Sequence, residues 1–294
     1  MAVKKIGFVG LGAMGLPMAR NLAKSQFNVR GFDLRPGAAA TLIEVGGESA
    51  DSAAAACAGA DAVMLMVVSL PQAESVLFDA GALDALAPGA VVIVSATCPP
   101  EGVVTLARRV EATGRLFVDA PVSGGVVGAE SGSLTIMASG SDAAFELAMP
   151  VLNKVGGKIV RVGSEPGQGA TAKAVNQLMC GVHIAVAAEA LSLAEKLGLD
   201  MDAMFDIVSG SAAGSWMLSN RGPRMLQADP PVTSAVDIFV KDLTIVLEAG
   251  HGAKTALPLA AVAHQLFLSV SGRGLGAIDD SQVIRAYRSL QGRE

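Results

Sequence analysis

The chain has few of the features that mark specialised classes of protein. Its 294 residues carry a net charge of −5, and lysine and arginine form no cluster, which argues against duplex nucleic acid as a partner. Aromatic residues make up 4%, too few for the stacking platforms that bind single-stranded nucleic acid. The composition therefore predicts no nucleic-acid partner.

No apolar run is long enough to cross a membrane. The most apolar stretch, residues 178–193, is interrupted by His183 and Glu189 and falls short of the roughly 20 apolar residues that a span requires. The apolar segment after Lys4 and Lys5 is too short for the core of a signal peptide. We therefore expect a cytoplasmic protein without a membrane partner.

Metal-ligating residues are also sparse. The three cysteines, Cys57, Cys98 and Cys180, lie far apart and lack the paired spacing of a zinc site. We expect no bound metal. We also expect reduced thiols, with Cys57 and Cys98 serving as small buried apolar side chains.

Residues 4–33, by contrast, carry a dense pattern. An apolar run leads into a glycine-rich turn, a helical run follows, and a second apolar run ends at Asp33. A strand, a glycine turn, a helix and a second strand closed by an acid form a dinucleotide-binding fingerprint. The turn reads Gly10, Leu11, Gly12, Ala13, Met14 and Gly15.

Each part of this pattern has a task in binding a dinucleotide. Gly10 permits the tight turn, Gly12 lets the backbone approach a pyrophosphate, and Gly15 allows the helix to pack closely on the strand. The helix N-terminus stabilises the phosphate charge. Asp33 follows Gly15 by 18 residues, close to the roughly 20-residue spacing of an acid that binds a ribose hydroxyl. The alternative is a structural turn followed by an unrelated acid.

Asp33 also bears on the choice of cofactor. Its carboxylate can accept hydrogen bonds from the ribose hydroxyls of NAD, and it would repel the 2′-phosphate of NADP. Arg35 lies two residues further on and can accommodate such a phosphate. On balance the sequence favours NAD.

Strand and helix signals alternate over roughly the first 160 residues, where helical stretches and Gly/Pro turns separate short apolar runs. The runs cover residues 6–9, 29–33, 62–68, 91–95, 116–119, 134–139 and 158–162. This alternation predicts an α/β Rossmann domain over residues 1–163, with a mostly parallel, doubly wound sheet.

Beyond Gly163 the period is helical throughout. The first helix, about residues 169–197, would be roughly 43 Å long and is apolar nearly all round, so it should be buried. Shorter helices should follow at residues 202–209, 215–226, 235–249, 257–271 and 281–290. We expect an all-helical domain over residues 164–294, joined to the first domain by the long helix. Its Ala/Leu/Val-rich helices predict a homodimer or homotetramer.

Oxidation of an alcohol by NAD requires a base for the hydroxyl proton. Histidine often serves, but no histidine here lies in a loop after a predicted strand, and we expect all three to pack between helices or to face solvent. They are His183, His251 and His264.

Lys173, in the first turns of the long helix, is the better candidate. Asn176, Gln177 and Cys180 follow it at spacings of three, four and seven, which places the four side chains on one helical face. Burial lowers the pKa of a lysine, so that it can act as a general acid or base near neutral pH. The alternative is a lysine whose stem packs while its ammonium reaches water.

A second candidate loop follows the predicted strand at residues 116–119. Ser123 offers a hydroxyl, and Gly124 and Gly125 offer unhindered backbone N–H groups, a combination that can bind a carboxylate. An ordinary glycine-rich turn is the alternative.

With these residues in place, the chain resembles the β-hydroxyacid dehydrogenase family, whose members include 3-hydroxyisobutyrate dehydrogenase, tartronate semialdehyde reductase and L-threonate dehydrogenase. Four family motifs match in order across the whole chain. They are Gly-Leu-Gly-Ala-Met-Gly-Leu-Pro-Met-Ala from Gly10, Asp-Ala-Pro-Val-Ser-Gly-Gly from Asp119, Gly-Ala-Thr-Ala-Lys-Ala-Val-Asn from Gly169, and Lys-Asp-Leu from Lys241.

The resemblance implies a role for each matching residue. Lys173 would be the catalytic acid/base and Asn176 its substrate-side partner. The substrate carboxylate would be bound by Ser123, Gly124 and Gly125, and the cofactor would be contacted by Thr97, Phe239 and Lys241. Ile93 and Ala96 stand where the family usually has Asp and Ser, which bears only on the local loop geometry.

A closer match is the run from Ser234 to Leu243 together with Gly214-Ser-Trp-Met, which resembles the L-threonate dehydrogenase branch of the family. In that branch Trp216, Asn220 and Arg221 would bind a polyhydroxylated acid. The alternatives are core packing for Trp216 and a surface position for Arg221.

We therefore expect NAD-dependent oxidation of a small hydroxy acid, with L-threonate as the best single substrate. Ser123, Lys173 and Asn176 would line the crevice, with residues 216–221 nearby. A 3-hydroxyisobutyrate dehydrogenase and a tartronate semialdehyde or glyoxylate reductase are the alternatives within the family. The reductase would prefer NADPH, against which Asp33 argues. A non-catalytic NAD-binding scaffold is a further alternative, and it would have no use for a buried lysine.

Overall fold

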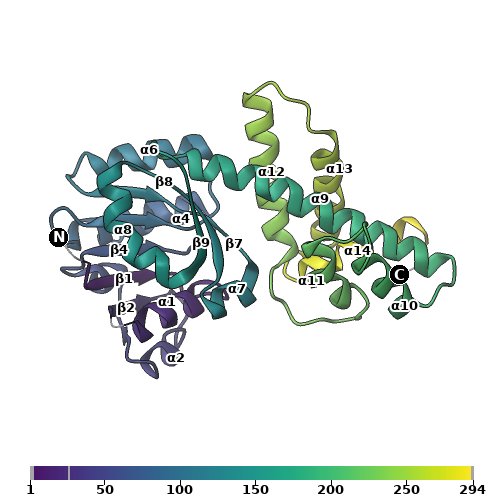
Figure 1. Ribbon diagram of the computed structural model, residues 1–294, viewed down its shortest axis with the longest axis horizontal. Coiled ribbons are helices and arrows are strands. Elements are labelled where there is room, and N and C mark those ends of the chain that lie inside the picture. The colour runs from purple at the N-terminus through teal and green to yellow at the C-terminus, as the bar shows by residue number, and fades with distance from the viewer. Residues whose placement is uncertain (1–2, 26, 293–294) are drawn as a thin grey trace. The chain divides into compact units, whose positions relative to one another are not determined.

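The computed structural model describes residues 3–25 and 27–292, which form two compact units. The division lies inside the longest helix, α9 (Gln168–Lys196), between Lys173 and Ala174. In Figure 1 the first unit, coloured purple to teal, surrounds a sheet, and the second, green to yellow, is built from helices. The α/β class with a helical second part is as predicted.

The described residues of the first unit contain a nine-stranded sheet of order β3-β2-β1-β4-β5-β6-β8-β7, with β9 paired to β8. The pairs from β3 to β6 are parallel, whereas β8 runs antiparallel to β6 and β7. The bounds are β1 (Lys5–Val9), β2 (Asn28–Phe32), β3 (Glu48–Ser49), β4 (Ala62–Leu65), β5 (Val91–Val94), β6 (Leu116–Asp119), β7 (Val122–Ser123), β8 (Leu134–Ser139) and β9 (Gly156–Gly163). The sequence missed β3 and β7, because two residues show no alternation.

Both faces of the sheet are covered, which explains why its central strands are apolar throughout. Phe8 and Met64 pack on one face, while Val9 and Leu65 pack on the other. The first face is covered by α1 (Gly15–Lys24), α2 (Ala40–Ile43), α7 (Gly125–Ser131) and α8 (Asp142–Val155). The second is covered by α3 (Ala53–Cys57), α4 (Leu70–Glu74), a π-helical turn (Ser75–Asp79), α5 (Ala82–Ala85) and α6 (Pro100–Glu111).

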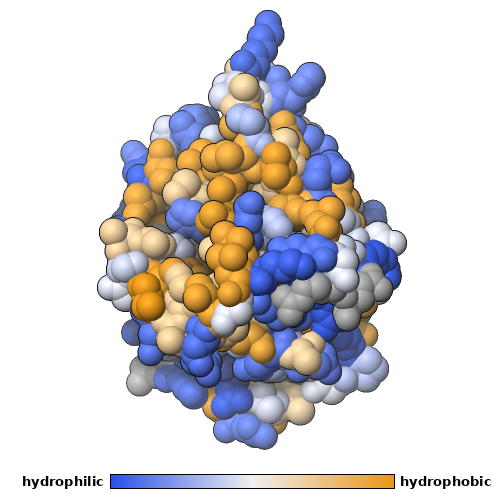
Figure 2. Space-filling view, turned by 90° about the vertical axis from the view of Figure 1, so that its right-hand side faces the viewer, coloured by the Kyte–Doolittle hydropathy of each residue, from blue (hydrophilic) through white to orange (hydrophobic). Residues whose placement is uncertain are grey.

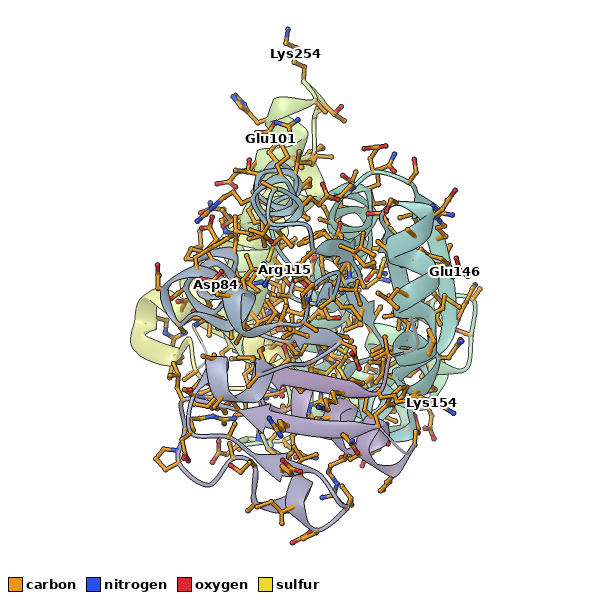
Figure 3. All side chains as sticks on the ribbon, turned by 90° about the vertical axis from the view of Figure 1, so that its left-hand side faces the viewer. Asp84, Glu101, Arg115, Glu146, Lys154 and Lys254 are labelled. Atoms are coloured by element: carbon orange, nitrogen blue, oxygen red, sulfur yellow. The ribbon has the colours of Figure 1, made fainter. Side chains whose placement is uncertain are left out.

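Charged side chains mark the outer surface of this unit (Figure 3). Glu146 and Lys154 point outward from α8. Arg115 lies beside Asp84 and donates from Nη2 to the carbonyl oxygens of Leu86 at 3.2 Å and Asp84 at 3.4 Å. These contacts tie the start of β6 to the end of α5.

The helical unit contains the rest of α9 and the helices after it. These are α10 (Met201–Ser209), α11 (Trp216–Met225), α12 (Val236–Gly252), α13 (Pro258–Val270), a π-helical turn (Ser271–Leu275), a 3-10 turn (Asp280–Val283) and α14 (Ile284–Leu290). Its core includes Phe239 stacked on Phe267, with ring centroids 5.2 Å apart. Ile184 and Leu191 supply the buried face of α9.

Helix α9 is not buried all round, contrary to the prediction. Four of its apolar residues, Val175, Met179, Val186 and Leu193, are exposed along one stripe, which Leu197 continues directly after the helix. The helices that follow in the chain cover only the opposite side. By length and composition α9 is the one helix of residues 3–25 and 27–292 that could cross a membrane, but 56% of its most apolar window is buried inside the protein.

Candidate active site

The glycine turn after β1 has room for glycine only. Gly10 has a φ of +95°, and a Cβ at this position would lie 2.4 Å from the carbonyl oxygen of Met66, which follows β4. A Cβ on Gly15 would lie 1.8 Å from the carbonyl oxygen of Gly10. At Gly10 and Gly15 the turn therefore passes against its neighbours without space for a side chain.

The same turn is open on the side where a pyrophosphate would bind. A Cβ on Gly12 would meet nothing nearer than Arg35 Nη2 at 4.0 Å. Ala13 is exposed, and Met14 begins α1 without a side-chain cap at the helix N-terminus. The N-terminus of α1 can thus receive phosphate oxygens. This cradle fits the diphosphate of a nicotinamide cofactor.

Asp33 lies directly after β2 and faces the turn. Its Oδ2 accepts a hydrogen bond from Leu11 N at 2.8 Å, and its Oδ1 accepts from Arg35 N at 2.9 Å and Arg35 Nε at 3.0 Å. Burial opposes ionisation, but these hydrogen bonds outweigh it and hold the pKa of Asp33 below its usual range. Asp33 is therefore an anion at neutral pH.

A pocket of about 380 Å³ opens beside Asp33. Its lining includes Asp33, Arg35 and Asp51. The Arg35 guanidinium also donates from Nη2 to the carbonyl oxygen of Leu11 at 3.0 Å, and its side chain is 65% exposed. The pocket thus presents a carboxylate for ribose hydroxyls and, at its rim, a cation able to turn toward a phosphate.

The carboxyl ends of β5 and β6 carry the next predicted residues at the same edge of the sheet. Thr97 is half-buried after β5. Ser123 ends β7, Gly124 (φ +134°) is the N-cap of α7, and Gly125 (φ +61°) is the first residue of that helix. The loop therefore places the backbone N–H groups of Gly124 and Gly125 at the start of a helix.

A residue that the sequence did not single out holds the start of α9. Asp119, the last residue of β6, is fully buried, and its Oδ2 accepts hydrogen bonds from Ala170 N at 2.7 Å and Gly167 N at 3.2 Å. Burial raises the pKa of Asp119 to about 7, against the effect of these hydrogen bonds. The signal available in the sequence was an acid at the end of a fully apolar strand.

Lys173 lies one turn further along α9 and is 6% exposed. Asn176, Gln177 and Cys180 share its face, and Cys180 Sγ lies 3.7 Å from Asn176 Oδ1. The helical period therefore places Lys173 and Asn176, the predicted acid/base and its partner amide, on one face of α9.

Gln177 links this face of α9 to α12. Its Nε2 donates to Asp242 Oδ2 at 2.5 Å, and Lys241 Nζ lies 2.8 Å from Asp242 Oδ1. Asp242 is buried, so one carboxylate holds both a helix α9 amide and the predicted cofactor lysine. The sequence did not reveal this pairing, since 65 residues separate Gln177 from Asp242.

The residues predicted to select the substrate differ in their surroundings. Trp216 is 52% exposed, so the core-packing alternative for it is wrong. Arg221 is 7% exposed and not on the surface, and it donates to Asp280 from Nε at 3.0 Å and from Nη2 at 2.8 Å. Its Nη1 donates to Asn220 Oδ1 at 2.6 Å. The Arg221 guanidinium is thus engaged inside the helical unit.

Phe239 lies in the core of the helical unit, where its ring is 3% exposed and stacked on Phe267. Its contact with the cofactor stays a prediction. Phe239 lies two residues before Lys241 on the same helix, α12.

The three histidines lie on helices of the second unit. His183 and His264 are half-buried on helices, and His251 is exposed. No group of His, Cys, Asp and Glu within the described ranges could hold a metal ion. Cys57 and Cys98 are buried, as predicted, and burial raises the pKa of the Cys57 thiol to about 12.

Two domain families match the chain. The NAD binding domain of 6-phosphogluconate dehydrogenase matches residues 5–163, and the NAD-binding domain of NADP-dependent 3-hydroxyisobutyrate dehydrogenase matches residues 167–287. The chain belongs to the 3-hydroxyisobutyrate dehydrogenase-like family of β-hydroxyacid dehydrogenases. This β-hydroxyacid dehydrogenase is therefore a nicotinamide-dependent enzyme of hydroxy acids, as the resemblance implied.

Relatives match this β-hydroxyacid dehydrogenase over nearly its whole length. An L-threonate dehydrogenase of Cupriavidus necator is 45% identical and covers 98% of this chain and 97% of its own. A solved 3-hydroxyisobutyrate dehydrogenase of Salmonella typhimurium has a TM-score of 0.92 and 42% identity, covering 96% and 99% of the two chains. A Mycobacterium tuberculosis 3-hydroxyisobutyrate dehydrogenase with L-serine has a TM-score of 0.82 and 31% identity, covering 98% and 100%.

Proposed function

We propose that this dehydrogenase uses NAD to oxidise L-threonate at C2, the hydroxyl-bearing carbon next to the carboxylate, to the 2-oxo acid. The observation that carries the proposal is the end-to-end similarity to the Cupriavidus necator L-threonate dehydrogenase, at 45% identity. The buried Lys173 and the Ser123–Gly125 loop supply the groups that the reaction requires. The cytoplasmic location belongs to the same proposal.

The proposed mechanism uses residues of the sheet edge and of α9. Ser123 and the N–H groups of Gly124 and Gly125 bind the substrate carboxylate. Lys173 Nζ takes the hydroxyl proton, and its positive charge then stabilises the developing carbonyl oxygen. Asn176 orients that oxygen. When bound, the nicotinamide accepts the hydride.

The cofactor would lie along the carboxyl edge of the sheet. Residues 10–15 would hold the diphosphate, Asp33 would accept hydrogen bonds from the ribose hydroxyls, and Thr97 and Lys241 would make further contacts. A preference for NAD over NADP follows from the ionised Asp33.

A second candidate activity is oxidation of 3-hydroxyisobutyrate, which the name of the Salmonella typhimurium relative favours. The deciding experiment is a turnover screen with NAD and NADP against four- to six-carbon sugar acids and 3-hydroxyisobutyrate. We expect the highest kcat/KM for L-threonate with NAD. Reduction of NAD with none of these acids would instead support the scaffold alternative.

Substrate selection is tested best at Asn220. Its Oδ1 accepts from Arg221 Nη1 at 2.6 Å and from Arg224 Nη2 at 3.4 Å, which turns the Nδ2 donor away from both guanidinium groups. Asn220→Ala should lower kcat/KM for L-threonate by about 10-fold, the value of one hydrogen bond. Oxidation of 3-hydroxyisobutyrate should fall by less than about twofold, because that substrate lacks the extra hydroxyls. Equal losses would show that the segment is structural.

We expect Arg221→Ala to lower kcat/KM for L-threonate as Asn220→Ala does, and the structure predicts a second effect, on stability. Breaking the buried pair with Asp280 should lower the free energy of unfolding by about 3–5 kcal/mol, since it leaves a buried charge uncompensated. Denaturant unfolding measures this loss. Arg285, whose Nη2 donates to an exposed backbone carbonyl, provides the matched control.

The exposed apolar stripe of α9 supports a homodimer or homotetramer. Figure 2 shows apolar residues gathered on the surface of the helical unit, and exposed apolar stripes such as that of α9 usually pack against another subunit. Light scattering should give two or four chains per particle. Val186→Glu with Leu193→Glu should yield smaller particles. A monomeric unmutated protein would contradict the proposal.

A further inference from the structure

The first turn of α9 is held by side chains that belong to the sheet. Asp119 Oδ2 accepts from the backbone N–H groups of Ala170 and Gly167, at 2.7 Å and 3.2 Å. Ser139, at the end of β8, accepts from Gly169 N at 3.0 Å, and its Oγ lies 3.5 Å from the same carboxylate oxygen. Thus two sheet residues satisfy N–H groups that a helix N-terminus otherwise leaves without partners.

The backbone of this turn also touches the sheet directly. A Cβ on Gly169 would lie 2.6 Å from the carbonyl oxygen of Met137 and 2.9 Å from Asp119 Oδ2. The start of α9 is therefore packed directly against the ends of β6 and β8, with no space for a side chain at Gly169.

Asp119 also lies directly before the loop that is proposed to bind the substrate carboxylate. Ser123 lies four residues after Asp119, and Lys173 lies three residues after Ala170, on the same face of α9. Asp119 therefore connects the two groups whose separation determines whether a bound hydroxyl reaches the lysine.

We propose that Asp119 is a positioning residue for Lys173, which it aligns with the Ser123–Gly125 loop by holding the first turn of α9 to the ends of β6 and β8. The proposal rests on the acid/base role of Lys173. Ser141, by comparison, is an ordinary cap that accepts a hydrogen bond from Ala144 N at 3.3 Å at the start of α8.

The test compares kcat, the KM of both substrates and thermal stability in matched variants. Asp119→Ala should lower kcat by about 10–100-fold, the effect of misplacing a reacting group by about 1 Å, while the KM for NAD changes less than about twofold. Asp119→Asn, which keeps an acceptor oxygen, should restore kcat to within about fivefold of the unmutated enzyme. Ser141→Ala should lower the Tm and leave kcat unchanged.

A double-mutant cycle with Lys173→Ala separates positioning from general destabilisation. If Asp119 acts through Lys173, adding Asp119→Ala to Lys173→Ala should cost less than about threefold more, because the group to be positioned is gone. Full additivity, or an unchanged kcat in Asp119→Ala alone, would overturn the proposal.

Two further outcomes are separable. If Lys173→Ala itself keeps more than about a tenth of kcat, the acid/base role fails, whatever Asp119 does. If Asp119→Ala does not fold, Ser139→Ala carries the test. It should lower kcat by about threefold or more in the unmutated background and not in Lys173→Ala, and an unchanged kcat there would refute the inference.

Discussion

Lys173→Ala should lower kcat by about 10²–10⁴-fold, the range for one general acid–base group, and leave the affinity for NAD nearly unchanged. Lys173 is almost fully buried on α9, whereas the proposed cofactor cradle is built from the turn after β1 and from Asp33. Loss of the amine should therefore remove the proton transfer without disturbing the cradle. Steady-state kinetics with L-threonate and a fluorescence titration with NAD measure the two quantities.

The matched control is Lys196→Ala, at the other end of the same helix, where the lysine is exposed. It should leave kcat within about twofold of the unmutated value. If Lys173→Ala retained more than about a tenth of the turnover, Lys173 would have no place in the mechanism.

Asp33→Ser should raise the Kd for NAD by about 10–100-fold, since hydrogen bonds to a charged group contribute about 1.5–3 kcal/mol. The same change should shift the preference toward NADP. The repelling carboxylate is then absent, and Arg35, which now donates to Asp33 at 3.0 Å, can pair with the 2′-phosphate. Kinetics with both cofactors measure the ratio of their kcat/KM values.

Two variants make this experiment specific. Asp33→Ser combined with Arg35→Ala should lose the gain with NADP. Glu48 is an exposed acid on β3 that pairs with Arg30 on β2, and Glu48→Gln should change the kcat/KM for neither NAD nor NADP. Comparable kcat/KM values for NAD and NADP in the unmutated enzyme would refute the role of Asp33.

The sequence predicted the first part of the fold because its signals are local. Strands such as β4 and β5 are buried on both faces, so each reads as a continuous apolar run. The predicted strand at residues 62–68 was too long, since the apolar residues after Leu65 lie in the connection to α4. Strands β3 and β7 have two residues each and leave no periodic signal.

The tight glycine turn after β1 was predictable for the same reason. A φ of +95° at Gly10 and the close approach at Gly15 are requirements of single positions, and only glycine meets them. That Lys173 and Asn176 share a helical face was predictable because the helical period alone places residues three apart on one face.

The tertiary structure decided what depends on residues far apart in the chain. Arg221 meets Asp280 across 59 positions, so a predicted substrate ligand is also one half of a buried ion pair. Phe239 stacks on Phe267, and Asp119 reaches Ala170 across 51 positions. Periodicity and motif spacing report only neighbours along the chain. The sequence by itself therefore determined the two fold classes, the glycine turn and the lysine face of α9, whereas the folded chain decided which polar groups pair with one another across long stretches of sequence.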